Sequence, residues 1–222
     1  MVRPALLAVS HGTADVDGAR DIAALVAQVR AALPDVDVIE AFVDVQQPDA
    51  AELAPQLDGP LVIVPLLLSS GFHVHHDLHG IASSRPRTAI AEPLGPDARL
   101  AEVLAQRVPP GDDPVVLAVA GSRDPRSLTD AEGMGALLEA RLGRAVHLAY
   151  LAARQPDLPA ALAEHPDAVV STYLLARGYF FDLAQRQTSE HRLTMPLLDG
   201  GPVPPPLVDL VVSRYEDAAG RL

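Results

Sequence analysis

Two histidines and an aspartate mark the ends of short apolar segments in the first half of the chain. His11 follows the first such segment, Asp44 ends the second and His73 follows the third. Two imidazoles and a carboxylate can hold a divalent first-row metal ion and still leave coordination positions open. A neutral imidazole can also accept a proton near pH 7. These residue types therefore indicate a site that handles a metal ion, protons or both.

The segments that carry these residues recur in the second half of the chain without the reactive side chains. Residues 6–13, 41–48 and 65–73 correspond to 117–122, 149–156 and 173–180. At an offset of about 108 residues, the replacements are Ala120 for His11, Ala152 for Asp44 and Phe180 for His73. Either histidine alone is equally well explained as an ordinary loop residue. Their joint loss from a repeat that keeps its apolar, Gly and Pro positions favours one shared site.

The repeat also predicts the domain organisation. We expect residues 1–108 to form a domain that carries the active site and residues 109–222 to form a degenerate copy, joined through the proline-rich segment 108–114. The aromatic block 179–181 departs from the polar site loop of the first copy, so we expect it to fill a retired pocket.

Short apolar runs alternate with longer Ala- and Leu-rich segments, which predicts βαβ units. The expected fold is α/β, with two tandem domains that each hold a small parallel sheet flanked by helices. Strands are predicted at 5–9, 36–42, 61–65, 88–91, 115–119, 146–150, 169–172 and 192–195, and helices at 17–33, 49–57, 98–107, 128–142, 158–165, 181–190 and 207–219. Ligands of open parallel sheets bind beyond the C-terminal strand ends. We therefore expect His11, Asp44 and His73 to face one cleft between the domains.

Further histidines follow the third segment. His73, His75, His76 and His79, with Asp77 among them, could bind a metal ion or pass it on. Most of these side chains could equally be solvated, and Asp77 could cap the helix that follows. The sequence leaves the roles of His75, His76 and His79 open.

The composition excludes several classes of site and partner. The chain has 222 residues, no cysteine and a formal net charge of −12. Disulfides and thiolate metal sites are therefore excluded. A strongly acidic chain is a poor partner for nucleic acid or an anionic membrane. Because no leader segment or run of about 20 apolar residues is present, we expect a cytoplasmic protein without membrane partners.

The segment Ser10–Thr13 suggests one alternative chemistry. Phosphohistidine enzymes of the phosphoglycerate mutase type carry Arg-His-Gly after their first strand, but here the position before His11 is Ser10. Without that arginine the phosphate loses a main charge partner, which argues against this class. The chain also contains no Walker loop, Gly-x-Gly-x-x-Gly fingerprint, Gly-x-Ser-x-Gly elbow or His-Glu-x-x-His helix.

Taken together, three motifs resemble those of the class II chelatases that insert cobalt or iron, and are most similar to the sirohydrochlorin chelatases in their two-domain bacterial form. They are His11-Gly-Thr13, Phe42-Val-Asp44 with Pro48, and Val64–His73 with Asp77. The resemblance implies that His11 and His73 handle the metal ion and the pyrrole protons. Asp44 stands where the family usually has Glu, which shortens the reach of the carboxylate. The resemblance and the repeat suggest as substrate-binding residues Ser10, Ser69, Ser70, Gly71, Phe72, Arg123 and Arg177.

The implied activity is insertion of a divalent metal ion into sirohydrochlorin, with Fe²⁺ as the first expectation and Co²⁺ as the second. The ion is then a substrate, and no permanently bound cofactor is expected. Sirohydrochlorin carries eight carboxylates, so arginines are candidate anchors: Arg85, Arg87, Arg123, Arg126 and Arg177. The alternative is a non-catalytic carrier that binds a metal ion or tetrapyrrole through the histidine-rich loop. We expect a monomer, with a homodimer as the alternative.

Overall fold

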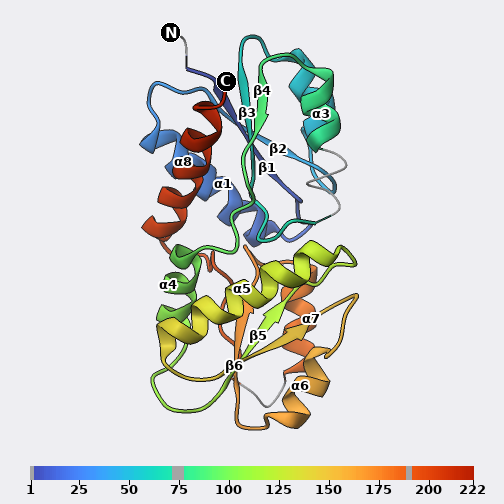
Figure 1. The fold of residues 1–222 in the computed structure, drawn as a ribbon, viewed down its shortest axis with the longest axis vertical. Helices are drawn as coiled ribbons and strands as arrows, with labels where there is room; N and C mark the ends of the chain where they lie inside the picture. Colours follow the sequence, from blue (N-terminus) through green and yellow to red (C-terminus); the bar gives the residue numbers. More distant parts are fainter. Residues whose placement is uncertain (1–2, 72–77, 189–191) are drawn as a thin grey trace.

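Two parallel sheets lie one above the other along the long axis of the molecule (Figure 1). The computed structural model describes residues 3–71, 78–188 and 192–222. The first sheet has the strand order β2-β1-β3-β4 and the second has the order β6-β5-β7. The strands are β1 (Ala5–Ser10), β2 (Val38–Phe42), β3 (Leu61–Pro65), β4 (Thr88–Ile90), β5 (Val115–Val119), β6 (Val146–Tyr150) and β7 (Val169–Tyr173). The predicted α/β fold with two parallel sheets is confirmed.

Helices flank both sheets. In the first half of the chain they are α1 (Val16–Ala32), α2 (Ala50–Leu53) with the 3₁₀ turn η1 (Ala54–Gln56), α3 (His79–Ser84) and α4 (Ala98–Arg107). In the second half they are α5 (Pro125–Leu142), α6 (Leu158–Glu164), α7 (Tyr179–Gln187) and α8 (Pro205–Ala219). No helix in the described ranges is both long and apolar enough to cross a membrane.

The strands are apolar because helices cover both of their faces. All five residues of β3 and all five of β5 are buried. Helix α1 contributes a buried stripe that includes Ile22, Leu25 and Val29. One apolar cluster contains buried side chains from both halves of the chain, whereas the opposite face of each sheet has a cluster of its own. The two halves are therefore joined through a common core on one side.

Helices α4 and α8 make most of the connection between the halves. Helix α4 precedes the expected boundary at residue 108, yet it packs against α5 and β7 of the second half. Helix α8 ends the chain and packs against α1, β3 and β4 of the first half (Figure 1). The boundary at residue 108 thus separates the strands of the two sheets but not these two helices.

Helix α5 begins earlier than the sequence pattern predicted. The side chain of Asp124 accepts a hydrogen bond of 2.9 Å from the amide of Arg126, and Pro125 occupies the first helical position. An aspartate cap followed by proline is a strong start signal. The expected start at residue 128 was placed too late because it followed the apolar residues alone.

The strand predicted at 192–195 is wrong: within the described residues this segment forms only an isolated bridge between Val170 and Leu193. The amide of Thr172 donates to the hydroxyl of Thr194 at 3.1 Å, and the hydroxyl of Thr172 donates to the carbonyl of Thr194 at 2.8 Å. Backbone bonds join Val170 to Arg192 and Thr194, but beyond Val170 the amide of Thr172 bonds a hydroxyl instead of a carbonyl, so the pairing stops at one bridge.

Candidate functional site

A cavity of about 980 Å³ lies where loops at the C-terminal strand ends of the first sheet meet their counterparts from the second. Ser10 of β1 pairs with Phe42 of β2, and Val9 pairs with Pro65 of β3, so the loops that follow these strands begin at one edge. In the second sheet, β5 pairs with β6 and β7 in the same parallel manner. Both copies therefore contribute wall residues to one cavity, as expected for open parallel sheets.

The loop after β1 places His11 on this wall. Gly12 has a φ of +88°, and a Cβ atom there would lie 3.2 Å from the carbonyl oxygen of Asp44. The amide of Thr13 donates to Oε1 of Gln46 at 2.9 Å. Glycine is needed for the turn, and the glutamine ties the β1 and β2 loops together. His11 is exposed and lines the cavity.

The loop after β2 brings the backbone of Asp44 next to the His11 loop. The Asp44 side chain is exposed, and its neighbour Val45, not Asp44 itself, lines the cavity. The structure therefore brings His11 and Asp44 onto adjacent loops but only His11 onto the wall. His73, Phe72, His75, His76 and Asp77 lie outside the described residues.

The loop after β3 also borders the cavity, and its residues 69–71 are here called the serine loop. Ser10, Ser69 and Gly71 line it, and the buried hydroxyl of Ser10 has no hydrogen-bond partner among the described residues. The amide of Ser70 donates to Oδ2 of Asp130 on α5 at 2.6 Å. The second half therefore holds this loop of the first half in place.

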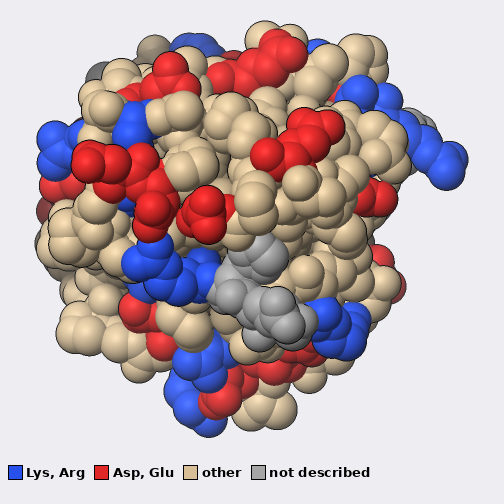
Figure 2. Space-filling model, turned by 90° about the horizontal axis from the view of Figure 1, so that it is seen from below, with Lys and Arg blue, Asp and Glu red and all other residues tan. Residues whose placement is uncertain are grey.

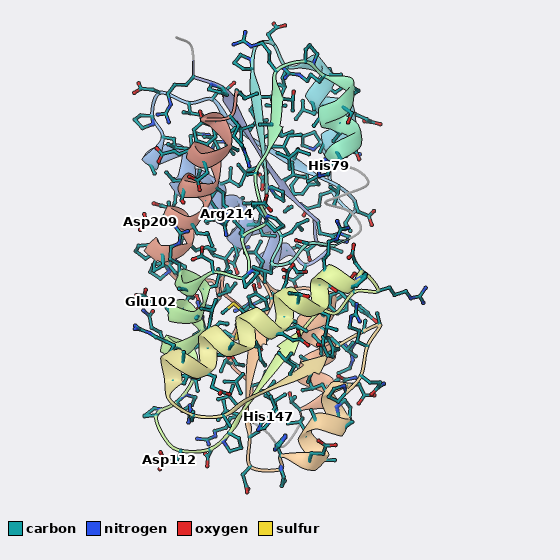
Figure 3. All side chains as sticks on the ribbon, in the orientation of Figure 1. His79, Glu102, Asp112, His147, Asp209 and Arg214 are labelled. Atoms are coloured by element: carbon teal, nitrogen blue, oxygen red, sulfur yellow. The ribbon has the colours of Figure 1, made fainter. Side chains whose placement is uncertain are left out.

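Within residues 3–71, 78–188 and 192–222, no three histidine or carboxylate side chains form a group that could hold a metal ion. His79 is exposed at the start of α3 (Figure 3) and does not line the cavity. His147, by contrast, lies at the far end of the second half, where its ring stacks on that of His165 with centroids 3.6 Å apart.

The candidate arginine anchors are mostly engaged elsewhere. Arg177 lies 3.4 Å from the carboxylate of Asp17 and donates to the carbonyl of Asp199 at 3.2 Å. Arg126 pairs with Asp124 at 2.7 Å. Arg85 donates to the carbonyls of Leu57 and Gly59. Arg123 and Arg87 are exposed, and none of the described residues on the cavity wall is an arginine.

Positive and negative charges are also mixed at the surface. On the lower face of the molecule, arginines lie beside carboxylates (Figure 2). Although the net charge of the chain is −12, acidic and basic side chains are thus interspersed on that face.

The second copy keeps the loop geometry of the first without its histidine. Gly121 has a φ of +86°, close to that of Gly12. Ser122 Oγ accepts from the amide of Asp124 at 3.2 Å, as Thr13 Oγ1 accepts from the amide of Asp15 at 3.1 Å. The duplicated backbone is therefore preserved while the side chains have changed.

Aromatic residues of the second copy form much of the opposite wall. Phe181 is 4% exposed and belongs to the second-half core, as expected for a filled pocket. All three residues 179–181 line the cavity, but Tyr179 differs from that expectation because it is 70% exposed. Tyr179 and Val45 are cavity residues that the sequence reasoning missed. The available signal for Tyr179 was its place in the repeat, where it follows Gly178 as Phe72 follows Gly71.

Two buried ionisable groups, Tyr173 on the cavity wall and Asp21 on α1, have shifted pKa values. Burial raises the pKa of Tyr173, and the nearby charges of Asp130 and Asp97 raise it further. Its hydroxyl donates to the carbonyl of Leu68 at 2.9 Å. Burial also raises the pKa of Asp21 on α1, although the positive charge of Arg177 opposes this. Tyr173 is thus a neutral hydrogen-bond donor.

The sequence matches the CbiX family model over residues 5–110 and 114–197, which covers both sheets. The chain belongs to the CbiX family. The class II chelatase family that the three motifs indicated is therefore confirmed. A relative named sirohydrochlorin cobaltochelatase, from Sulfurisphaera tokodaii, is 34% identical to this CbiX-family chain over 79 residues. The match covers 32% of this chain and 66% of that relative, just under two thirds of its length.

Solved structures share the fold of this CbiX-family chain. SirB from Bacillus subtilis with Fe³⁺ superposes with a TM-score of 0.80 at 23% identity, covering 99% of this chain and 96% of SirB. A CbiX described as the terminal enzyme for biosynthesis of siroheme in denitrifying bacteria gives a TM-score of 0.73 at 20% identity, covering 96% of this chain and 99% of that one.

Proposed function

We propose that this CbiX-family chain inserts a divalent metal ion into sirohydrochlorin, with Fe²⁺ as the first substrate ion and Co²⁺ as the second. The observation that carries the proposal is the cavity of about 980 Å³, with walls from both halves and His11 on one of them. Its volume is at the upper end of the range of ligand pockets, which suits a macrocycle better than a small metabolite. The name of the Sulfurisphaera relative and the iron and cobalt in SirB structures support the same substrate class.

The chemistry requires groups that exchange protons and metal ions. The tetrapyrrole must lose two pyrrole protons while the ion loses water and moves to the ring nitrogens. A neutral imidazole can accept a proton or donate its lone pair to the ion. We assign both tasks to His11 and His73. Asp44, whose side chain is exposed beside the His11 loop, would accept protons through water or orient the ion.

Ser10, Ser69 and Gly71, which line the cavity, are proposed to contact the substrate from the first half. Ser70, which does not line it, and Phe72, which lies outside the described residues, are proposed from the resemblance alone. Arg123 follows Ser122, which lines the cavity, and is the proposed anchor for a substrate carboxylate. Arg177 would have to leave Asp17 to take such a role, so it is the weaker candidate. Because both walls come from one chain, we propose that the monomer is active.

Metal insertion under anaerobic conditions tests the proposal. Purified protein, sirohydrochlorin and Fe²⁺ or Co²⁺ are mixed, and the absorbance change of the macrocycle gives the rate. We expect a rate above buffer for the native chain, a large loss for His11→Ala and His73→Ala, and no loss for the control His147→Ala. His147 lies at the far end of the second half.

Two outcomes would contradict the enzyme. The native chain is not a catalyst if its rate equals that of buffer or the rates of both His11→Ala and His73→Ala. If the native chain still binds the ion or the tetrapyrrole in that case, the carrier alternative replaces it. The ratio of kcat/KM for Fe²⁺ and Co²⁺ in the same assay decides the preferred ion.

A further inference from the structure

Two large apolar side chains remain exposed at the cavity. Val45 is 56% exposed and Tyr179 is 70% exposed, and both line its wall. Val45 comes from the loop after β2 in the first half, and Tyr179 begins α7 in the second half. Exposed apolar groups at the two sides of a cavity are available to a ligand that has apolar surfaces of its own.

The backbone at Val45 is strained. Its φ is +36°, a region that β-branched residues avoid. The amide of Gln46 donates to the carbonyl of Asp44, which closes a tight three-residue turn around Val45. Glycine would fit this turn without strain. Strained backbone of this kind is found where a site needs a particular side chain, so the valine points to a role for its isopropyl group.

The duplicated turn provides an internal comparison. Ala153 occupies the corresponding place after β6, with a φ of +65°. It is exposed but does not line the cavity. Both copies therefore have a positive φ at this place, whereas a large apolar side chain stands only in the copy that reaches the cavity wall. The positive φ does not require valine.

The position of Tyr179 depends on a close approach of the two halves. Gly178 has a φ of +152°, and a Cβ atom there would lie 2.7 Å from Oγ1 of Thr13 in the His11 loop. Tyr179 follows directly, and its ring makes an edge contact with Phe180 at a centroid distance of 5.4 Å. The contact of Gly178 with the first half thus places the Tyr179 ring on the cavity wall near the His11 loop.

We infer that Val45 and Tyr179 contact the two flat faces of the bound tetrapyrrole and hold the ring in position for the metal ion. The inference rests on the proposed function, since it names contacts for that substrate. A tetrapyrrole has apolar faces and, in sirohydrochlorin, charged groups only around its edge. Aliphatic and aromatic side chains suit the faces, while the carboxylates can remain in water. The scarcity of arginine on the described wall agrees with binding through the faces.

Matched glycine substitutions separate contact from strain. Val45→Gly removes the side chain and the strain together, whereas Ala153→Gly relieves the equivalent turn away from the cavity. We expect Val45→Gly to raise the KM for sirohydrochlorin roughly tenfold, the worth of one buried valine side chain. We expect kcat and the thermal midpoint to stay level or rise. Ala153→Gly should leave KM unchanged.

The tyrosine is tested in the same assay. Tyr179→Ala should raise KM about tenfold, because stacking on an extended ring is lost. Tyr179→Phe should restore the native value, since it keeps the ring. Binding of metal-free sirohydrochlorin, followed by absorbance, should weaken in parallel for Val45→Gly and Tyr179→Ala.

Several results would overturn the inference. One is a KM for sirohydrochlorin in Val45→Gly or Tyr179→Ala that equals the native value. Another is a KM in Ala153→Gly that rises as much as in Val45→Gly. The third is a Tyr179→Phe variant that binds no better than Tyr179→Ala. These results are distinct from failure of the proposed function. If the proposed function fails, the native chain itself neither binds nor metallates sirohydrochlorin, and the inference fails together with the proposed function.

Discussion

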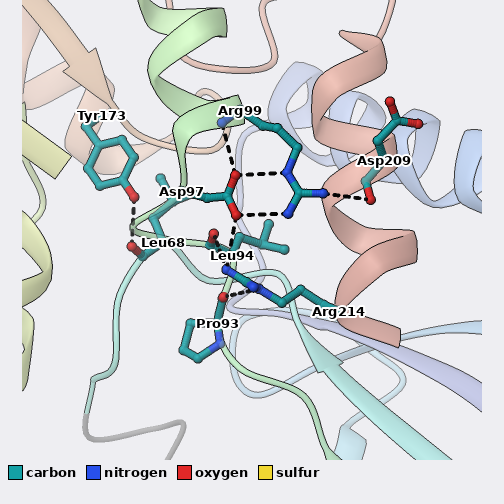
Figure 4. Close-up of polar contacts among 8 residues, drawn as sticks. All are labelled: Leu68, Pro93, Leu94, Asp97, Arg99, Tyr173, Asp209 and Arg214. Atoms are coloured by element: carbon teal, nitrogen blue, oxygen red, sulfur yellow. Dashed lines mark hydrogen bonds and ion pairs between the residues drawn. The ribbon is translucent and has the colours of Figure 1, made fainter. Parts of the chain in front are cut away.

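The hydroxyl of Tyr173 at the end of β7 donates a hydrogen bond of 2.9 Å to the carbonyl oxygen of Leu68, which precedes the serine loop of the first half (Figure 4). Tyr173 is buried, so the bond is shielded from water. Together with the bond from the amide of Ser70 to Asp130, it fixes the serine loop to the second half from two sides. The position of that loop therefore depends on both halves.

Tyr173→Phe is expected to destabilise the protein by about 1–3 kcal/mol, because the Leu68 carbonyl loses its partner in a buried place. The midpoint of urea unfolding measures the change. Tyr215→Phe is a suitable comparison, since its hydroxyl donates to the carbonyl of Pro4 at 2.7 Å, away from the cavity. We expect both variants to lose stability but only Tyr173→Phe to raise the KM for sirohydrochlorin. An equal KM in the two variants would contradict the role assigned to the Leu68 bond.

Gly95→Ala is expected to cost about 1–3 kcal/mol or more, because the added Cβ atom would overlap the Tyr173 hydroxyl and the Leu68 carbonyl. Gly80→Ala in α3 serves as the control, since nothing lies within 4 Å of its added Cβ atom. Alanine at such a helical position should stabilise the protein by about 0.4–1 kcal/mol. Thermal unfolding of the two variants should therefore shift in opposite directions.

The carboxyl of Asp97 is expected to make the free energy of unfolding depend on pH in the acidic range. Burial opposes ionisation of its carboxyl, but hydrogen bonds from Arg99 and the charge of Arg214 outweigh this and lower its pKa (Figure 4). A lowered pKa in the folded state adds stability at pH values above the ordinary value of 3.8. That stability is lost as the pH falls through the folded-state value.

Asp97→Asn should therefore be less stable than the native chain near pH 7, and the difference should shrink as the pH falls below about 4. Urea unfolding at a series of pH values gives the measurement. The control is Asp35→Asn, because Asp35 is exposed. A difference for Asp97→Asn that stays constant with pH would argue against the ion pairs.

Asp44→Asn should lower kcat by about 10²-fold if the carboxylate accepts protons, and Asp44→Glu should retain or raise it. Glutamate is the residue usual at this place in the family that the motifs resemble. Asp49→Asn is the control, since Asp49 lies further along the same loop and its carboxylate is engaged in capping α2. Native kcat in Asp44→Asn would remove Asp44 from the catalytic group.

Most strands could be predicted because buried parallel strands are short and apolar. The predicted segments at 61–65, 115–119 and 146–150 agree with β3, β5 and β6 residue by residue. The prediction at 192–195 was wrong because this segment pairs with β7 only around Val170, and side-chain bonds between Thr172 and Thr194 follow instead of further ladder bonds. Helix partners were not predictable either, since periodicity shows that α4 has an apolar face but not which sheet it covers.

Residues of the candidate site could be predicted where the residue type itself indicates a chemical role. His11 could be named because an imidazole after a strand end is conspicuous, and it lines the cavity. The roles of His11, Asp44 and His73 stay predictions. Val45 was missed because valine suggests a core residue, and its exposure follows from a backbone turn that no sequence pattern reveals. Arg177 was proposed from its charge and its place in the repeat, and neither reveals its contact with Asp17.

The packing of α4 and α8 bears on how the chain came to be duplicated. Each is the last helix of its own copy, and each covers the sheet of the other copy, so the exchange is reciprocal. Such an exchange is what a two-fold symmetric dimer with swapped terminal helices would leave behind after fusion into one chain. Severing the chain at the linker would give two fragments, each separated from the helix that shields its sheet. The two copies are therefore interdependent for folding, although only one retains the histidines.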